Sequence, residues 1–376
     1  MGKLDKREKI ILWGSGIKAR QIMLYSIVTG GSFRIVGMID NAPNAPSGAI
    51  GKHKIIRPQQ LSELVFDKIV ISTDRDFEVI KKQLIHDFNI QPCKIENSLY
   101  FSKKLLVAKY RKSKDEEIRH VIEYLQENPL QVLNYDFVKY YEEVKPEIGY
   151  DEQAGMYYVL HKNRPIYMAK RLNTPEKVAQ YYRSISVEQD SRSPHAYLDE
   201  KFQIRKGDVI LDAGVAEGNF SFEIIDKASK IYMVEADKEW IKALKYTFAA
   251  YEDKVVILNA FVSDYSADNT KKLDDLIHEP VNFIKMDVEG YEAQAFKGAA
   301  RLIQDSKDLK CAICVYHNDH DEVMIKKMAR NYGMTYTTTA GYMYFPLGKK
   351  QHYISPTLRR GILRCKKGES PSSPMM

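Results

Sequence analysis

The sequence predicts an α/β protein with two parallel-sheet domains and a helical and hairpin segment between them. The first hundred residues alternate short apolar runs of β character with helical stretches, and the same alternation returns from Asp208 onward. In both stretches a glycine-rich turn follows an apolar strand and opens a helix, as in a doubly wound sheet. We expect a smaller domain over 1–102, a connector over 103–200, a larger domain over 201–367 and a tail over 368–376.

The smaller domain starts with an apolar run that Gly14-Ser-Gly16 brings to an end. A helix is expected directly after this turn, and Asp40 lies at the end of the second expected strand. Turn residues then predict a loop. The expected elements are strands over 9–13, 34–39 and 68–72, helices over 17–28 and 76–88, and a loop over 41–48.

The connector is less regular and rich in tyrosine. It predicts a helix over 115–127 and a hairpin whose strands, 156–160 and 166–169, flank a polar turn. Thr174-Pro175 predicts the start of another helix, because threonine is a good N-cap and proline fits the first helical position. We interpret this region as a connecting and capping segment.

The larger domain repeats the strand–helix alternation, with helices expected over 238–250 and 292–303. Short strands close the domain, and the tail after them lacks the apolar content to pack, which predicts disorder. The expected strands cover 209–212, 231–235, 255–258, 281–286, 311–316, 334–339, 342–345 and 361–365.

The strongest motif is Asp212-Ala-Gly214-Val-Ala-Glu-Gly218, which joins a strand to a helix. Glycines let the backbone approach a ligand closely. An acid before the first glycine would repel a phosphate, but it suits a cationic amino group such as that of S-adenosylmethionine. Glu235 ends the next strand, where an acid accepts hydrogen bonds from a ribose diol. The alternative is a tight strand–helix turn with a capping acid.

A second motif places Asp287, Glu289 and Glu292 after an apolar strand that contains Lys285. Ligands of open α/β sheets bind at such carboxyl ends. In an extended chain Asp287 and Glu289 would face the same side, and Gly290 is expected to start a helix. Solvated acids at a helix N-terminus are the alternative. Three acids beside a lysine exceed what a cap needs, and grouped carboxylates shift one another's pKa values.

Together these motifs resemble the FkbM family of S-adenosylmethionine-dependent methyltransferases. The resemblance covers about 205–365, and Ile284-Lys-Met-Asp-Val-Glu-Gly-Tyr-Glu292 is its most specific part. The chain departs from the family at Val215-Ala216, where Ala-Asn is usual, and at Glu235-Ala236, where Glu-Pro is common. The other matching segments are 211–221, 234–236, 272–276, 296–299 and 315–317.

The resemblance implies a class I methyltransferase fold, with a Rossmann-like doubly wound sheet, and an O-methyltransferase activity. It implies cofactor contacts from the glycine-rich turn and from the ends of the following strands. The implied cofactor residues are Asp212, Gly214, Glu217, Gly218, Asn219, Phe220, Glu235, Ala236, Ser263, Asp264 and Asp287.

Methyl transfer to a hydroxyl requires an in-line approach and a base within hydrogen-bond reach of the proton. The candidates for this base are Asp287, Glu289 and His317. His317 is expected at the end of the next strand, on the same rim as Asp287. A divalent ion held by these acids would be an alternative to a side-chain base.

Cys311, Cys314, His317 and His320 stand three apart, which has the appearance of a zinc pattern. In a strand, however, residues three apart point to opposite faces. Zinc sites also separate their ligand pairs by a longer loop. We therefore interpret both cysteines as core thiols and predict no metal site here.

The amino-terminal Gly14-Ser-Gly16-Ile-Lys-Ala19 fits a dinucleotide fingerprint, with Asp40 at the spacing of its ribose-binding acid. The region resembles the Rossmann-type domains of sugar-nucleotide epimerases and related sugar-modifying proteins. This resemblance implies a second site for NAD or a nucleotide sugar. The alternative is a domain of the same shape that binds no nucleotide.

A polar segment precedes the larger domain and includes Glu188-Gln-Asp190 and Ser193-Pro-His195-Ala-Tyr197. It also resembles the lead-in of the family and could fold over the cofactor. The alternative is a polar loop with an exposed His195.

Composition restricts the function classes. Apolar residues make up 44% and charged residues 28%, which argues against global disorder. No apolar run is long enough to span a bilayer, the start resembles no signal peptide, and four cysteines make no disulfide scaffold, so we expect a cytoplasmic protein. The net charge of +7 is a modest excess, with basic residues gathered over 103–114 and 359–367.

The sequence thus favours a methyltransferase that acts on a hydroxyl of a sugar or glycan precursor. The main rival is a nucleotide-sugar oxidoreductase or epimerase that works through residues 1–100, but no Tyr-x-x-x-Lys pair lies within those residues to act as a proton donor. A basic, tyrosine-rich RNA-binding protein is a third class, and it lacks an aromatic and basic recognition motif. The acceptor's identity and the oligomeric state do not follow from the sequence.

Overall fold

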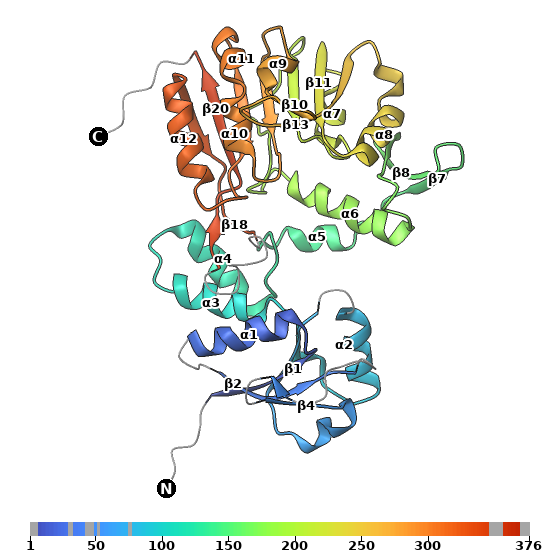
Figure 1. Cartoon of the computed structure of the whole chain (residues 1–376), viewed down its shortest axis with the longest axis vertical. Helices are drawn as coiled ribbons and strands as arrows, with labels where there is room; N and C mark the ends of the chain where they lie inside the picture. The colour runs from blue at the N-terminus through green and yellow to red at the C-terminus, as the bar shows by residue number, and fades with distance from the viewer. Residues whose placement is uncertain are drawn as a thin grey trace. The chain divides into compact units, whose positions relative to one another are not determined.

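The computed structural model describes residues 7–28, 33–41, 49–50, 53–73, 77–345 and 356–368. Most of the predicted loop over 41–48 and nearly all of the predicted tail lie outside the described residues. The chain forms two compact units, one of Met1–Val132 with Pro346–Thr357 and one of Leu133–Phe345 with Leu358–Met376 (Figure 1). The connector is therefore divided, with 103–132 in the first unit and 133–200 in the second.

The first unit is a six-stranded sheet covered by helices on both faces. Ile10 and Leu12 pack under one layer, whereas Ile11 and Trp13 pack under the other, as the alternation of a doubly buried strand requires. The strands, in the order β3-β4-β2-β1-β5-β6, are β1 (Glu8–Trp13), β2 (Phe33–Ile39), β3 (Ala49–Ile50), β4 (His53–Ile56), β5 (Lys68–Ile71) and β6 (Ile95–Glu96). The helices are α1 (Ile17–Val28), α2 (Phe77–His86), α3 (Tyr100–Tyr110), α4 (Glu116–Glu127), η1 (Pro58–Glu63) and η2 (Pro92–Lys94).

The second unit is built on a seven-stranded sheet of order β12-β11-β10-β15-β16-β20-β17. Its first five strands are parallel, and β20 runs antiparallel to both of its neighbours. The carboxyl ends of β10, β11, β15 and β16 therefore meet at one edge. These strands are β10 (Val209–Ala213), β11 (Lys230–Glu235), β12 (Val255–Asn259), β15 (Phe283–Met286), β16 (Lys310–Cys314), β17 (Met334–Thr338) and β20 (Ile362–Lys367).

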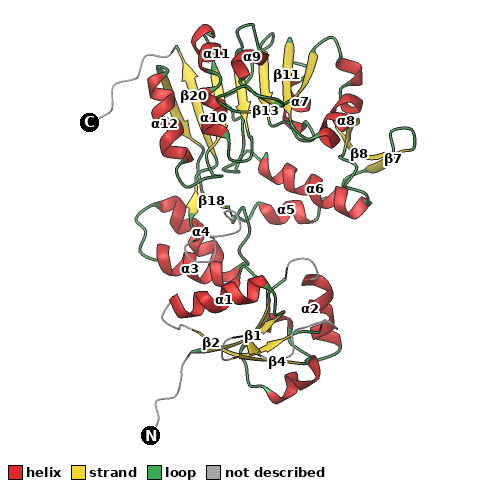
Figure 2. Ribbon diagram, in the orientation of Figure 1, coloured by secondary structure: helices red, strands yellow, loops and turns green. Residues whose placement is uncertain are grey.

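Helices cover both faces of this sheet (Figure 2). One face packs on α9 (Leu273–Leu276), α10 (Glu292–Lys297), α11 (Ala300–Asp305) and α12 (Asp321–Asn331). The other packs on α5 (Val138–Glu142), α6 (Pro175–Glu188), α7 (Asn219–Ile224), α8 (Lys238–Thr247) and the sheet of β7 (Ile148–Asp151), β8 (Met156–His161) and β9 (Arg164–Tyr167). Residues 133–200 are thus a layer of this unit. The remaining elements are η3 (Ala249–Tyr251), β13 (Phe261–Val262), β14 (Thr270–Lys271), β18 (Met343–Tyr344) and β19 (Leu358–Arg359).

Two expected elements differ from the structure. The helix expected over 292–303 is two helices, α10 and α11, separated at Gly298. A β-carbon at Gly298 would lie 2.1 Å from the carbonyl oxygen of Ser263, so this close approach needs glycine. The strand expected over 311–316 ends at Cys314, which places His317 in the loop beyond β16. Among the described residues, every helix is too short or too polar to cross a bilayer.

Candidate active site

Asp212, at the end of β10, is fully buried and points away from solvent. Its carboxylate lies 3.1 Å from Lys285 Nζ and accepts a hydrogen bond of 2.7 Å from the Ser221 hydroxyl. Lys285 also donates to the carbonyl of Gly214. Burial works against the charge of Lys285, but the carboxylates of Asp212 and Asp287 raise its pKa above the ordinary value. The pair therefore fixes the turn that follows β10.

Gly214 brings this turn against the neighbouring strand. Its φ is +77°, and a β-carbon there would lie 1.7 Å from the carbonyl oxygen of Asp287. Only glycine fits so close an approach at a positive φ. The turn is thus packed directly against the backbone of Asp287.

Ala216 adopts a φ of +50°, which is unfavourable for a residue with a β-carbon. Its amide donates a hydrogen bond of 2.9 Å to Glu235, which also accepts 2.8 Å from the amide of Asp237. Asparagine tolerates this conformation better than alanine, so the departure from the family's usual Ala-Asn places strain in the turn. Glu235 holds the strained turn through its side chain.

A large cavity of about 720 Å³ opens beside this turn, at the carboxyl ends of β10, β11 and β15. Glu235 lies at its wall, and both apolar and aromatic side chains contribute to the lining. Its principal lining residues are Gly214, Ala216, Val234, Glu235, Ala236, Trp240, Val262, Ser263, Tyr265, Asp287, Glu289 and Tyr291.

A small cavity of about 270 Å³ adjoins it and extends toward α6 and the loop after β16. The two cavities share Gly214, Ala216, Asp287 and Glu289. Carboxylates and aromatic rings dominate the wall of the small cavity. Its principal lining residues are Tyr181, Glu188, Gln189, Tyr197, Gly214, Glu217, Asn219, Phe220, Lys285, Asp287, Glu289, Tyr316, His317 and Phe345.

The loop after β15 is a turn rather than the extended chain that the sequence predicted. Glu289 has a φ of +54° and Gly290 a φ of +96°. The helix begins at Glu292 instead of Gly290, and the fully buried Glu292 accepts hydrogen bonds from the amides of Val288, at 2.9 Å, and Gly290, at 3.3 Å. A strained residue that its surroundings hold in place is common at functional sites.

His317 brings the three acids of this loop together. Its Nδ1 lies 2.9 Å from Glu292 Oε1, while Nε2 lies 3.8 Å from Asp287 Oδ1 and 3.6 Å from Glu289 Oε2. Burial disfavours the charged ring, but Glu292, Asp287 and Glu289 together raise the pKa of His317 above its ordinary value. Glu292 therefore orients the imidazole, and His317 lines the small cavity.

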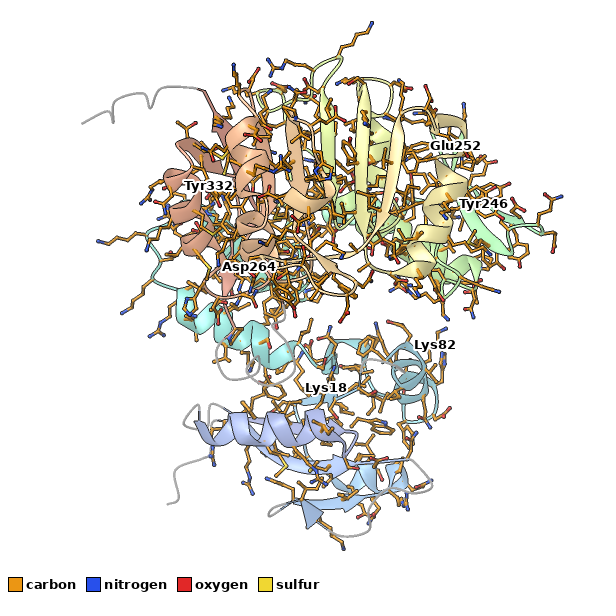
Figure 3. The ribbon with its side chains drawn as sticks, turned by 45° about the horizontal axis from the view of Figure 1, so that its top comes forward. Lys18, Lys82, Tyr246, Glu252, Asp264 and Tyr332 are labelled. Carbon is orange, nitrogen blue, oxygen red and sulfur yellow. The ribbon has the colours of Figure 1, made fainter. Side chains whose placement is uncertain are left out.

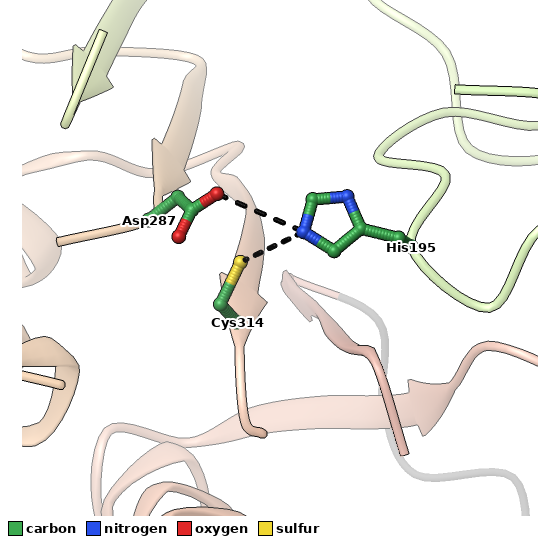
Figure 4. A group of neighbouring side chains, drawn as sticks. All are labelled: His195, Asp287 and Cys314. Atoms are coloured by element: carbon green, nitrogen blue, oxygen red, sulfur yellow. Dashed lines mark hydrogen bonds and ion pairs between the residues drawn. The ribbon is translucent and has the colours of Figure 1, made fainter. Parts of the chain in front are cut away.

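Asp287 lies beside His195 (Figure 4), and a tyrosine and a second histidine also approach its carboxylate. Tyr197 donates a hydrogen bond of 2.7 Å to its Oδ2, and His195 Nε2 lies 3.7 Å from the same oxygen. Burial opposes ionisation of Asp287, but Lys285, His195, His317 and the Tyr197 hydroxyl lower its pKa. Asp287 is therefore held as a carboxylate.

His195 is buried, so the alternative interpretation, a polar loop with an exposed His195, was wrong. Burial lowers the pKa of His195 to about 4, which keeps the ring neutral. The Gln189 amide lies 3.3 Å from Nδ1, whereas Nε2 lies 3.0 Å from the Tyr316 hydroxyl. The sequence singled out the segments that contain Tyr197, Tyr316 and Gln189 but not the contacts of these residues with Asp287 and His195, since those contacts join segments far apart in the chain.

The predicted cofactor residues do not all line a cavity. Ser263 and Ala236 line the large cavity, and Glu217, Asn219 and Phe220 line the small one. Asp212, Gly218 and Asp264 line neither. The carboxylate of Asp264 (labelled in Figure 3) pairs instead with Lys297 at 2.7 Å, and a β-carbon at Gly218 would meet Leu244 at 2.7 Å.

In the first unit, Gly14, Gly16 and Ala19 stand at the start of α1 as predicted. Asp40 accepts hydrogen bonds from both the amide, at 2.9 Å, and the hydroxyl, at 2.5 Å, of Ser15. These bonds turn the acid back onto the glycine turn. A nucleotide site in this unit stays a prediction.

Cys311 and Cys314 are buried in different hydrophobic clusters, on opposite faces of the sheet, as their spacing in a strand predicted. Among the described residues, two other groups have the donor types of a metal site: His195 with Asp287 and Cys314, and Asp287 with Glu292 and His317. In the second group Glu292 is already engaged by two backbone amides and the imidazole. The contacts of Glu292 therefore favour a role in orienting the ring of His317.

Two family models match the chain. Residues 6–96 match "C2185-like, N-terminal", and residues 200–333 match "Methyltransferase FkbM domain". No curated protein sequence matches the chain.

Solved structures of methyltransferases are also similar. A methyltransferase FkbM from Methylobacillus flagellatus KT shares 15% identity, covers 96% of this chain and 90% of its own, and has a TM-score of 0.43. A putative methyltransferase from Streptococcus mutans in complex with SAH shares 15% identity over 44% of this chain and 90% of its own, with a TM-score of 0.31. A putative RNA methyltransferase from Pyrococcus horikoshii shares 14% identity over 61% of this chain and 95% of its own, with a TM-score of 0.32. At these TM-scores the similarities support no conclusion beyond the family match.

The sheet order and the family match define an S-adenosylmethionine-dependent methyltransferase of the class I, Rossmann-like fold. Within that class, residues 200–333 match the model of the methyltransferase FkbM domain, as their motifs predicted.

Proposed function

We propose that the chain is an O-methyltransferase that binds S-adenosylmethionine in the large cavity and a sugar or glycan-precursor hydroxyl in the small one. The observation that carries this proposal is that the two cavities share Gly214, Ala216, Asp287 and Glu289. Methyl transfer needs a donor and an acceptor on opposite sides of one short gap. A wall common to both cavities provides such a place.

The residues present fit the cofactor. Gly214 and Glu235 both line the large cavity, and Glu235 stands where a ribose diol would meet an acid. Each Glu235 oxygen accepts one backbone amide and keeps a lone pair for a further donor. When bound, the cofactor supplies an electrophilic methyl group on a sulfonium.

His317 is the base in this proposal. Glu292 holds the proton on Nδ1, which leaves Nε2 in the small cavity to accept the hydroxyl proton. Asp287, kept ionised by its neighbours, stabilises the imidazolium that then forms, since its carboxylate lies 3.8 Å from Nε2. Tyr197 and His195 fix the position of Asp287.

The lining of the small cavity favours a sugar acceptor. Rings such as Tyr181, Tyr316 and Phe345 can cover the apolar faces of a sugar, while Glu217 and other carboxylates of the wall can accept hydrogen bonds from its hydroxyls. The same carboxylates would repel a phosphate backbone, which argues against a nucleic-acid acceptor.

The test is a methyl-transfer screen with labelled S-adenosylmethionine against sugars, amino sugars, nucleotide sugars and RNA, with mass spectrometry of the products. A methyl ether on a sugar, absent when His317→Ala replaces the wild type, supports the proposal. Methylated RNA or an N-methylated product would overturn the acceptor class. Parallel thermal shifts with S-adenosylhomocysteine, NAD and nucleotide sugars show whether the first unit binds a nucleotide of its own.

A further inference from the structure

Glu188 is the last residue of α6, and its side chain lines the small cavity. Within the described part of the chain, no hydrogen bond or ion pair engages its carboxylate. The position is unfavourable for an anion for two further reasons. The C-terminal end of a helix carries partial negative charge, and the nearby acids Asp287, Glu217 and Glu289 add to it.

The other acids of this region are paired. Asp212 is bound to Lys285, Asp287 accepts from Tyr197, and Glu217 accepts a hydrogen bond of 2.6 Å from the Tyr181 hydroxyl. Lys285, the buried cation of the site, is committed to Asp212 and to a backbone carbonyl. Among the described residues, Glu188 is thus an acid of the cavity wall with no cation paired to it, and the charge of Lys285 acts on it only from a distance.

The missing partner has an energetic consequence. Burial, followed by the charges of Asp287 and Glu217, raises the pKa of Glu188 to about 8. A carboxyl group held this way destabilises the folded chain at neutral pH, unless a ligand with positive charge compensates it. A cationic group in the small cavity would do so.

The expected partner of the cofactor's ammonium group does not fill that role. The sequence pointed to Asp212, but this acid lines neither cavity and is neutralised inside the sheet. Glu188 lines the small cavity beside the turn of residues 214–217, and the large cavity shares Gly214 and Ala216 of this turn. The amino-acid end of a donor held in the large cavity would therefore reach Glu188 across the shared wall.

We propose that Glu188 pairs with the α-ammonium group of the methyl donor. This inference rests on the proposed function, because it takes the methyl-donor site as given. It extends the cofactor site to α6, outside the residues 200–333 that match the family model. The segment Glu188-Gln-Asp190 is then part of the donor site, and not only a lead-in to it.

Calorimetry with the full chain tests the pairing. S-adenosylhomocysteine and its deamino analogue, which lacks only the α-ammonium group, are titrated into wild type, Glu188→Gln and Glu176→Gln. Glu176 is an exposed residue in the first turn of the same helix and provides a matched control. Circular dichroism confirms that each variant is folded.

Loss of a charge-assisted pair should weaken S-adenosylhomocysteine binding by Glu188→Gln roughly 10- to 100-fold. Glu176→Gln should bind as wild type does, and the deamino analogue should bind wild type and Glu188→Gln equally. Unchanged affinity of Glu188→Gln, or an equal loss for both ligands, would overturn the pairing. Failure of wild type to bind S-adenosylhomocysteine at all would instead overturn the proposed function.

Discussion

Replacement of Glu292 by glutamine removes a charge from His317 and keeps the shape of the site. The amide oxygen of glutamine can still accept from the backbone amides of Val288 and Gly290, so the loop should keep its conformation. Glu292 is also the carboxylate nearest to His317, at 2.9 Å, and it is fully buried. Its charge is therefore the largest favourable influence on the imidazolium.

The magnitude follows from this geometry. A single opposite charge within about 4–6 Å shifts a pKa by roughly 1–3 units, and each unit corresponds to about 1.4 kcal/mol. Because the raised pKa of His317 depends first on Glu292, Glu292→Gln should lower it by at least about one unit. Glu289→Gln is the control, since its side chain is 89% exposed and 3.6 Å away, so solvent screens its charge.

The assay is the pH dependence of kcat/KM for methyl transfer. His317 must be neutral to accept a proton, so the rate of the wild type rises with pH through the pKa of this residue. Glu292→Gln should move that limb to lower pH, and Glu289→Gln should move it much less. Affinity for S-adenosylhomocysteine should stay within about threefold of the wild type in both. A limb unmoved by Glu292→Gln, or moved further by Glu289→Gln, would refute the role of His317 as base.

Three other perturbations follow from the described geometry. Gly214→Ala should lower S-adenosylhomocysteine affinity more than about tenfold and lower Tm, because its β-carbon would meet a backbone oxygen at 1.7 Å. Calorimetry measures the affinity and thermal melts measure Tm. A variant that matches the wild type in both would show that the turn is not fixed. Ala216→Gly should raise the free energy of unfolding by about 1 kcal/mol in denaturant titrations, because glycine adopts a positive φ without strain. The control Ala243→Gly, inside α8, should lower it. A lower free energy of unfolding for both variants would disprove the strain at Ala216. The pKa of Glu188 is about 8 in the folded chain and has its ordinary, lower value in the unfolded chain. The unfolded chain therefore loses this proton at lower pH, so Glu188 lowers the stability of the fold progressively as pH rises between the two pKa values. Glu188→Gln should therefore raise the Tm of the ligand-free chain at pH 8 and much less at pH 5, and an equal change at both would count against an unpaired acid.

Local signals in the sequence predicted all seven strands of the larger sheet, but of the smaller sheet they predicted β1, β2 and β5 and not β3, β4 or β6. Helix α1 spans Ile17–Val28 as expected, and Thr174 caps α6 through a hydrogen bond from the amide of Lys177, at 3.4 Å. Apolar runs followed by acids also placed the carboxyl ends of β10, β11 and β15 on one edge. These features depend on residues close together in the chain, where periodicity and turn chemistry are reliable guides.

The features that sequence reasoning missed depend on distant pairs. Tyr197 and Asp287 are 90 positions apart, and nothing local marks them as partners. His195 and Tyr316 are 121 positions apart, and this larger separation concealed the burial of His195 against Tyr316. One signal was available for Asp212: a lysine inside an otherwise apolar strand, Lys285, requires a buried acid on the neighbouring strand. That requirement assigns Asp212 to the sheet interior rather than to the ligand.

Binding of S-adenosylhomocysteine to the full chain tests most directly whether the large cavity holds the methyl donor. Calorimetry should show saturable binding of one molecule per chain, and Ala236→Trp should abolish it, since Ala236 lines this cavity and lies outside the glycine turn. A Tm close to that of the wild type would show that the variant is folded. Absence of binding by the wild type, or binding that survives Ala236→Trp unchanged, would contradict the assignment of the cavity.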